Sequence, residues 1–594
     1  MFVYGDVLQT ECPRTKLIWL TEALRQLAGM PPGVARHGAL VGALIEAGEL
    51  AQGIADARFA ETGERDARWP ECAAAMALLA RIAQAVRASW ESGFARLGAG
   101  LPEPEIRALA AARLPEAVRT KRAEGFALYS LYPEGYLRAA ATALGPAAGA
   151  IRAIGIRSIG APLAAMVAAA VGAPPPVTVR PVGHPFRRRL ALTEELTAEL
   201  LADPAARFAV ADEGPGLSGS SFGAVADFLE DHGVAVERLH FFPSHRGPPG
   251  PRASPRHRDR WARTARHMVD VGELLLHAPW RPEHRLAAWA AELIGAAPAG
   301  PLEEISTGLW RAHHYAREAD WPAAKVQFER RKFLLRTAGG GDRSGTWLLK
   351  FAGLGREGMR KLERARALQG AGLIPPVAGY RHGFLVERWV AEARCLDQHP
   401  PAFARGRLVE QIGRYLGFRA RHFSAGPDRG ASLAMLWEMA RHNTRLALGS
   451  DLAHRLHRCW AAADLDRLES RLHRVETDNR LHAWEWLVLP DGRLLKADAL
   501  DHHAAHDLVG CQDIAWDIAG AVVELGLSEA ERERLCVVVE REAGRTLDPR
   551  LLALLEPCYL AFQLADHAMA AAGAAGWGAE PDRLRAAAAR YAAR

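Results

Sequence analysis

Apolar residues recur at three- to four-residue spacing through the first quarter of the chain. The spacing is clearest over residues 14–27, 35–57 and 72–97, and it predicts amphipathic helices. Nothing in this part gathers polar groups as densely as a catalytic site does. We therefore expect an all-helical segment over residues 1–147, serving as a helical cap or a dimer surface.

From about residue 151, short apolar strands alternate with helices. Strands are predicted near residue 154 and at 176–180, 208–211 and 234–242. Strands that alternate with helices are typical of a parallel sheet. We expect such a sheet in a domain over residues 148–300.

The pattern changes again after residue 300. Strand-like runs at 332–337 and 346–351 flank a glycine-rich turn, and a helix at 358–368 precedes a hairpin at 377–390. These elements predict a small lobe over residues 301–398.

The last part of the chain, residues 399–594, is helical in pattern apart from one hairpin at 484–498. Its Asp491-Gly492 turn lies between two apolar strands, which is a strong hairpin signal. The expected fold class is therefore a multidomain combination of α/β and α+β, with an N-terminal helical segment, a parallel-sheet domain and a C-terminal domain of two lobes.

Length and composition restrict the classes of function. A chain of 594 residues exceeds the size of one hydrophobic core, so about three domains are expected. Seven cysteines without a CxxC pair argue against a disulfide framework and against a zinc site. The net charge of +6 comes from 75 basic residues, only seven of them lysine. This mild excess suits phosphorylated small molecules, and without a basic tail no nucleic acid is expected as a partner.

The hydropathy profile gives no reason to expect a membrane protein. The N-terminus lacks a basic region followed by an apolar stretch, and the longest apolar run, 161–173, is too short to span a bilayer. We expect a cytoplasmic protein that acts on small molecules. The sequence leaves a homodimer open.

The densest candidate chemistry follows the strand at 208–211. Asp212 and Glu213 end this strand, and a loop rich in glycine and serine leads into the next helix. Glycines let backbone N–H groups approach a phosphate, serines add hydroxyl donors, and the helix N-terminus adds a favourable dipole. Two acids beside a phosphate require a partner, and ribose hydroxyls or Mg²⁺ are the usual ones. The alternative is a plain strand-to-helix turn.

This stretch resembles the 5-phosphoribosyl-1-pyrophosphate (PRPP) loop of type I, orotate-type phosphoribosyltransferases. The resemblance implies that Asp212 and Glu213 hold ribose and Mg²⁺. It also implies a phosphate cradle made by Gly214, Gly216, Ser218, Gly219, Ser220 and Ser221. Four residues separate the acids from Ser218 where the family pattern usually has three, so the cradle differs in shape.

The same resemblance assigns roles to basic residues elsewhere in the sheet domain. Arg157, Ser158 and Gly160 match the loop that holds pyrophosphate, and Arg180 ends the following strand. Arg187, Arg188 and Arg189 match in type the mobile loop that closes over pyrophosphate during catalysis, because the arginine fork binds phosphate oxygens. A surface arginine run is the alternative. His245 and Arg246, at another strand end, are expected near the acceptor.

The C-terminal half resembles aminoglycoside phosphotransferases and choline kinases. Lys350 lies in an apolar strand, and Glu363 lies on the next helix. In the kinase-like fold such a lysine contacts the phosphates of ATP and the glutamate holds the lysine. The resemblance therefore implies an ATP site with a Lys350–Glu363 pair.

The catalytic segment of these kinases matches less well. Asp478 and His482 are the candidate catalytic residues, and Glu485 and Asp498 the candidate Mg²⁺ ligands. If His482 takes the position of the family's histidine, Arg480 stands where the catalytic aspartate belongs and Glu485 replaces an asparagine. If Asp478 is the base, its spacing to Glu485 is longer than usual. A kinase fold without phosphotransfer activity stays open.

Three functions remain after these observations. The first is an enzyme that transfers ribose 5-phosphate from PRPP to a small acceptor and uses ATP in its C-terminal domain to phosphorylate the product or a related molecule. The second is a regulator that binds nucleotides or PRPP without turnover. The third is a small-molecule or protein kinase with a nucleotide-recognition domain.

Overall fold

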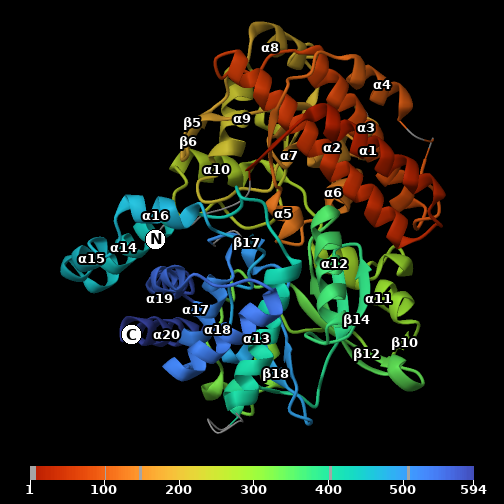
Figure 1. Ribbon diagram of the computed structural model, residues 1–594. Coiled ribbons are helices and arrows are strands. Elements are labelled where there is room, and N and C mark those ends of the chain that lie inside the picture. The colour runs from red at the N-terminus through yellow and green to blue at the C-terminus, as the bar shows by residue number, and fades with distance from the viewer. Residues whose placement is uncertain (1–7, 99, 101, 146–149, 400–404, 505–508) are drawn as a thin grey trace.

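The computed structural model describes residues 8–98, 100, 102–145, 150–399, 405–504 and 509–594. Its N-terminal part is helical, as predicted, with one two-stranded sheet that the pattern missed (Figure 1). The helices are α1 (Pro13–Gly29), α2 (Val34–Glu61), α3 (Pro70–Glu91), α4 (Glu103–Ala111), α5 (Glu124–Ala127) and α6 (Pro133–Leu144), and the strands are β1 (Leu8–Glu11) and β2 (Val118–Lys121). Helix α3 has the length and composition of a membrane span, a test that buried helices also pass, and it packs against α2 and α7.

A five-stranded sheet follows, and all its strands are parallel, as predicted. Its order is β4-β3-β7-β8-β9, so the strand order reverses between β3 and β7. The strands are β3 (Ile151–Ile156), β4 (Val177–Val179), β7 (Arg207–Ala211), β8 (Leu239–Phe242) and β9 (Ala265–Arg266). The remaining elements are α7 (Gly160–Val171), the hairpin β5 (Val182–His184) and β6 (Arg187–Arg189), α8 (Glu194–Leu200), α9 (Ser220–Asp231), α10 (Pro255–Arg263) and α11 (Leu286–Ile294).

The small lobe is an antiparallel sheet with one helix. Its strands run in the order β10-β12-β13-β15-β14, and β11 also pairs with β12. They are β10 (Ala297–Pro298), β11 (Glu303–Glu304), β12 (Lys332–Ala338), β13 (Gly345–Phe351), β14 (Val377–Arg381) and β15 (Phe384–Arg388), and α12 (Arg356–Gly370) joins β13 to β14.

The large lobe is mainly helical. Two short sheets join β16 (Arg394–Cys395), β18 (Trp486–Val488) and β19 (Leu494–Lys496), and β17 (Arg474–Val475) with β20 (Gln512–Asp513). The helices are α13 (Arg405–His422), α14 (Leu433–Leu448), α15 (Ser450–His457), α16 (Ala462–Glu469), α17 (Ala515–Leu525), α18 (Glu529–Ala543), α19 (Pro549–Gly573) and α20 (Glu580–Ala592). The predicted hairpin is confirmed, because β18 and β19 pair antiparallel about Asp491-Gly492.

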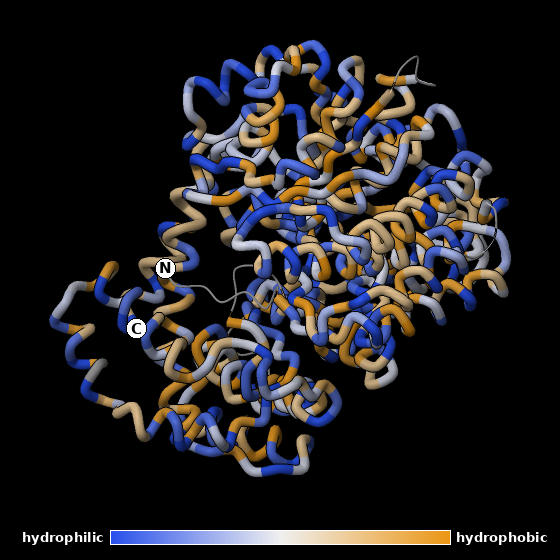
Figure 2. The backbone as a smooth tube through the Cα atoms, turned by 90° about the horizontal axis from the view of Figure 1, so that it is seen from above, coloured by the Kyte–Doolittle hydropathy of each residue, from blue (hydrophilic) through white to orange (hydrophobic). Residues whose placement is uncertain are grey.

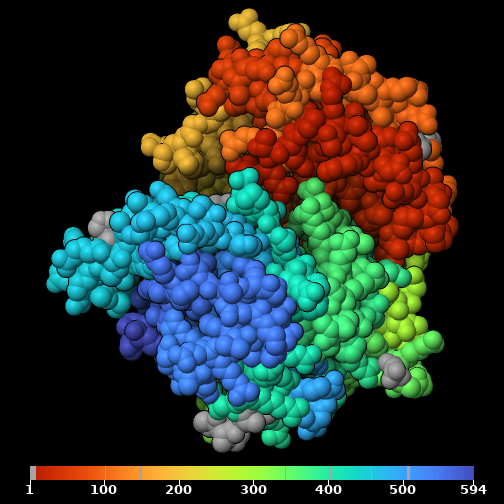
Figure 3. All heavy atoms as spheres, in the orientation of Figure 1, coloured from red at the N-terminus to blue at the C-terminus, as the bar shows by residue number. Residues whose placement is uncertain are grey.

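The hydrophobic core joins parts that lie far apart in sequence. One cluster runs from α1–α3 through α7 to the small-lobe residues Phe333, Leu349 and Phe384. A second cluster fills the large lobe and reaches α12. Accordingly, the small lobe lies between the N-terminal helices and the large lobe (Figure 3). Hydrophobic and hydrophilic positions interleave along most segments, as expected of elements with one buried face (Figure 2). The predicted boundary at 147/148 lies outside the described residues.

Candidate functional site

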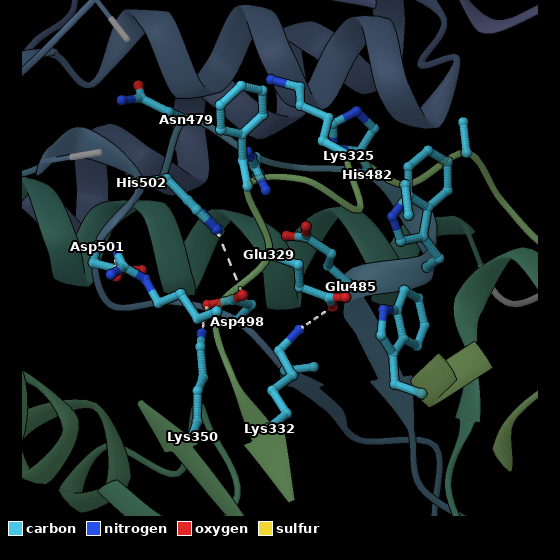
Figure 4. A pocket seen from close by; sticks show the side chains of 18 of the residues that line it. Lys325, Glu329, Lys332, Lys350, Asn479, His482, Glu485, Asp498, Asp501 and His502 are labelled. Carbon is cyan, nitrogen blue, oxygen red and sulfur yellow. Dashed lines mark hydrogen bonds and ion pairs between the residues drawn. The ribbon is translucent and has the colours of Figure 1, made fainter. Parts of the chain in front are cut away.

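A cleft lies between the small-lobe sheet and the β18–β19 hairpin. Side chains from both lobes point into it (Figure 4). Lys350 reaches it from β13, and Asp498 reaches it from the residues just after β19, where its carboxylate accepts a hydrogen bond from Lys350. Burial disfavours the lysine charge, but Asp498 outweighs that cost and holds the pKa of Lys350 above its usual value. The cleft thus presents a cation on one lobe and a carboxylate on the other.

The predicted ion pair between Lys350 and Glu363 is wrong. Glu363 lies exposed on α12. At 3.6 residues per turn, positions two apart lie on opposite faces of a helix, and the inward face of α12 carries Lys361 instead. Lys361 Nζ donates to Asp501 Oδ2 at 2.9 Å. Asp498 therefore takes the place that the sequence assigned to Glu363.

Glu485 and Asp498 both line the cleft, from the two outer ends of the hairpin. Lys496 lies between them and donates to Glu485 Oε2 at 2.6 Å and to the backbone oxygen of Asp498 at 2.5 Å. Their ligand atoms belong to two neighbouring groups that share His502, one with Asp478 and Glu485 and one with Asp498 and Asp501, each within 4.8 Å. Carboxylate oxygens at this spacing fit a hard cation such as Mg²⁺.

Asp478 lies behind the cleft and is buried. Tyr415 donates a hydrogen bond to its carboxylate, and Lys496 lies 3.6 Å away. Burial raises the pKa of Asp478, but the Lys496 charge outweighs burial and lowers the pKa to about 2. Its backbone N–H donates to Asp517 Oδ2 at 2.7 Å. These bonds hold the loop in place and leave Asp478 poorly suited to act as a base.

His482 does line the cleft. Its ring stacks on Trp484 at a centroid distance of 4.4 Å, and its Nδ1 has no hydrogen-bond partner among the described residues. Burial, with His567 and Arg480 nearby, holds the pKa of His482 well below its usual value. The imidazole is therefore neutral.

Sequence reasoning missed most of the other charged groups of the cleft. Asp501 and His502 follow Asp498, and Lys325, Glu329 and Arg330 come from the segment before β12. The small number of lysines in the sequence is the signal that could have identified some of these residues. Of seven lysines, Lys325, Lys332 and Lys350 line the cleft, and Lys361 and Lys496 bind its carboxylates.

Apolar side chains also line the cleft. They are Trp310, Leu348, Trp389 and Leu487. Aromatic and aliphatic side chains in the same cleft as several lysines suit a planar base that carries phosphates.

A segment before β12 crosses from the small lobe to the large lobe and borders the cleft. We call residues 309–331 the bridging segment. Arg311 pairs with Glu580 of α20 at 2.9 Å, and both side chains are buried. Lys325 pairs with Asp566 of α19, also inside the cleft. The bridging segment therefore ties the two lobes together.

The parallel sheet places its predicted loop where its strand order reverses. Asp212 and Glu213 follow β7, next to β3, and ligands bind outside strand ends at such a point. Burial raises the pKa of both acids to about 7. The hairpin β5–β6 covers the loop: Ser220 Oγ donates to the backbone oxygen of Pro185 at 2.7 Å. Arg188 Nη1 donates to Ser221 Oγ, also at 2.7 Å.

The structure places the predicted pyrophosphate arginines against carboxylates. Arg157 is buried and donates to Asp56 Oδ1 at 2.8 Å and to Asp66 Oδ1 at 2.5 Å. Arg180 Nε also donates to Asp56, at 2.9 Å. These arginines hold α2 and the following turn against the sheet, so the expectation that they are free to bind pyrophosphate is wrong.

The other residues of the predicted phosphate and pyrophosphate loops lie in three places. Ser158 and Gly160 lie in the turn that begins α7. A Cβ at Gly160 would meet the Ala211 backbone oxygen at 2.6 Å, so the glycine permits close packing. Arg187 and Arg189 are exposed on β6, as an anion-binding or a plain surface role requires. Gly214, Gly216, Ser218 and Gly219 form the loop before α9.

A second cavity lies at the ends of β7 and β8. Glu213, His245 and Arg246 line it, together with Arg331 from the bridging segment. That His245 and Arg246 contact an acceptor stays a prediction. Tyr129 lines both this cavity and the cleft. The two candidate sites therefore share a wall.

Glu387 on β15 gives a pH-dependent prediction. Burial raises its pKa to about 7 although Lys350 opposes the shift. Between about pH 4.5 and 7 the folded protein keeps a proton that the unfolded chain releases, so stability should fall as pH rises through this range. Glu387→Gln should raise the free energy of unfolding by about 1–3 kcal/mol at about pH 8 and not at about pH 4.

Urea unfolding at the two pH values measures this effect. Glu392→Gln, at an exposed position on the turn after β15, is the control and should change stability equally at both. An equal change for Glu387→Gln would contradict the assignment.

Comparisons with known proteins add the following. No protein-family model and no curated protein matches this sequence. Choline kinase LicA from Streptococcus pneumoniae aligns at 15% identity over 44% of this chain and 90% of its own, with a TM-score of 0.29. A choline/ethanolamine kinase family protein from Mesorhizobium loti aligns at 15% identity over 51% and 92%, also at 0.29.

A glucosamine kinase in complex with glucosamine, ADP and inorganic phosphate aligns at 16% identity over 44% and 81%, with a TM-score of 0.28. Likenesses at these identities and TM-scores carry no weight for function. The function is therefore argued from the cleft itself.

Proposed function

We propose that the cleft binds Mg·ATP and transfers its γ-phosphoryl group to a small molecule. The observation that carries this proposal is the meeting of Lys350 with Asp498 across the two lobes, in a cleft that apolar side chains also line. The lysines would neutralise the phosphates, and the apolar side chains would hold the base. Asp498, Asp501 and His502 would hold Mg²⁺, which when bound neutralises charge on the phosphates.

The chain's own residues suggest how transfer proceeds. The acceptor hydroxyl attacks the γ-phosphorus, the bond to the β–γ bridging oxygen breaks, and ADP leaves. We assign His482, whose neutral imidazole lines the cleft, to orient the acceptor hydroxyl by a hydrogen bond, while the hydroxyl proton passes to an oxygen of the transferred phosphoryl group. Arg480, which also lines the cleft, would stabilise charge on the transferred group.

The test is ATP consumption with a panel of small hydroxyl compounds, including amino alcohols and sugars, followed by detection of phosphorylated product. Mg-dependent ADP release that requires an acceptor supports the proposal. Binding of Mg·ATP without consumption would instead favour a regulator with a non-catalytic cleft.

A second candidate function belongs to the parallel sheet. We infer that the loop after Asp212 and Glu213 binds the ribose 5-phosphate part of a ligand, and PRPP-dependent transfer is the reaction that the loop chemistry favours. The strand-order reversal at β3 and β7, and the cavity beside Glu213, support it. The pairing of Arg157 and Arg180 with Asp56 requires that pyrophosphate be held by other groups, such as Arg187–Arg189.

Removing the two acid charges should weaken PRPP binding. Asp212→Asn with Glu213→Gln should raise the Kd for PRPP by about 30- to 1,000-fold, because charge-assisted hydrogen bonds to ribose are lost. Calorimetry measures the change, and Asp203→Asn, at a partly exposed position before β7, is the control. Unchanged affinity would contradict the assignment of Asp212 and Glu213 to PRPP binding.

A further inference from the structure

Three titratable side chains meet in the interior, between the N-terminal helices and the small lobe. His37 comes from α2, Glu134 from α6, and His382 from the turn between β14 and β15. His37 Nε2 lies 2.8 Å and His382 Nε2 2.7 Å from the same atom, Glu134 Oε1. The side chains are 0%, 0% and 1% exposed. The cluster lies apart from both sites described above.

The polar atoms of this cluster are incompletely satisfied. Glu134 Oε2 and His382 Nδ1 are buried and have no hydrogen-bond partner among the described residues. A buried carboxylate with an unbonded oxygen is costly unless a positive charge faces it. Among the described residues, the two imidazoles are the basic groups in contact with Glu134, so the positive charge would come from them or from a cation bound between them.

The arrangement matches the requirements of a metal ligand set. Two imidazole nitrogens and a carboxylate are the donors that Zn²⁺ accepts. His37 Nδ1 lies 3.0 Å from Ser89 Oγ, and this contact fixes the ring with Nε2 directed at Glu134, as outer partners of metal-bound histidines do. Trp90 and Phe94 pack around the His37 ring and exclude water.

We propose that His37, Glu134 and His382 bind one divalent transition metal, Zn²⁺ by preference, which ties the N-terminal helices to the small lobe. Glu134 Oε2 would supply the fourth donor, and chelation by one carboxylate, whose two oxygens lie close together, would distort the site from a regular tetrahedron. Tetrahedral ligands about 2.1 Å from Zn²⁺ lie about 3.4 Å apart, so each imidazole nitrogen must move about 0.6 Å further from Glu134 Oε1 than the 2.8 and 2.7 Å seen here. Burial of all donors makes the ion structural. The sequence argued against a zinc site because it has no CxxC pair. That argument concerns cysteine ligands and does not apply to a site made of histidine and glutamate.

The first experiment measures metal in the full-length protein, prepared without a histidine tag. Elemental analysis should find about one zinc ion per chain. Exchange into Co²⁺ should produce the intense visible absorption of a tetrahedral site. If the zinc content is below about one tenth and Co²⁺ gives no such absorption, the cluster is a hydrogen-bonded Glu–His pair and the proposal is overturned.

Substitutions locate the ion. His37→Gln and His382→Gln should each lower bound metal at least tenfold. His284→Gln is the matched control. His284 is equally buried, its ring stacks on Trp90, and its Nε2 hydrogen-bonds the backbone oxygen of Trp90, yet it lies outside the cluster. Metal retained in His37→Gln and lost in His284→Gln would contradict the assignment. Should His37→Gln fail to fold, the wild-type metal content and Co²⁺ spectrum decide alone.

Discussion

Asp498→Asn should lower the kcat of ATP-dependent phosphorylation by about 10²–10³-fold, the usual cost of removing one electrostatic group from an active site. Asp498 faces both Lys350 and His502, at 3.6 Å from the latter. Its loss removes an oxygen from the proposed Mg²⁺ site and leaves Lys350 without its closest anion. The KM for Mg·ATP should rise as well.

The control lies in the same hairpin. Asp491→Asn, in the exposed turn between β18 and β19, removes the same charge away from the cleft and should leave kcat unchanged. Circular dichroism and a thermal melt confirm that both variants fold. If Asp498→Asn turns over like the wild type, the cleft does not catalyse phosphotransfer through this carboxylate.

Arg311→Met should lower the free energy of unfolding by about 1.5–3 kcal/mol, because the buried carboxylate of Glu580 loses its bidentate partner and keeps Arg583 and the Ala324 N–H. Arg311 Nη2 and Nη1 donate to the two oxygens of Glu580 at 2.9 and 3.2 Å, and the side chains are 2% and 3% exposed. This buried ion pair holds the bridging segment against α20. Urea unfolding followed by tryptophan fluorescence measures the change.

Arg317→Met is the matched control in the same segment. Arg317 pairs with Asp320 in solvent, so its loss should leave the free energy of unfolding nearly unchanged. The double variant Arg311→Met with Glu580→Met should recover part of the loss, since a hydrophobic pair replaces the weakened ion pair. Equal effects of Arg311→Met and Arg317→Met would show that the bridging segment is not fastened here.

Local patterns predicted the elements well, because their causes are local. Strand β7 and hairpin β18–β19 follow from apolar runs and from the Asp491-Gly492 turn. The same reasoning correctly placed Lys350, Glu485 and Asp498 along one cleft, since hairpin ends lie side by side. The strands β1 and β2 are short and far apart in sequence, and no local pattern marks their pairing.

The errors concern contacts between distant segments. Glu363 was assigned to Lys350 by family resemblance, but the face of α12 that turns inward depends on how the helix packs. Arg157 carries no sign in its own loop that Asp56, about a hundred residues earlier, neutralises it. Packing of the N-terminal helices on the sheet decides that pairing. The His37–Glu134–His382 cluster went unnoticed for the same reason, since its members come from three separate segments.

Tyr129 has a consequence for how the two halves of the chain communicate. Its ring borders both the cleft and the cavity beside Glu213. A ligand that turns the ring on one side changes the volume left for a ligand on the other side. Linkage makes such an influence equal in both directions: whatever the first ligand does to the affinity of the second, the second does to the first. If both proposed ligands bind, this one shared residue would couple their affinities without any rotation of whole lobes.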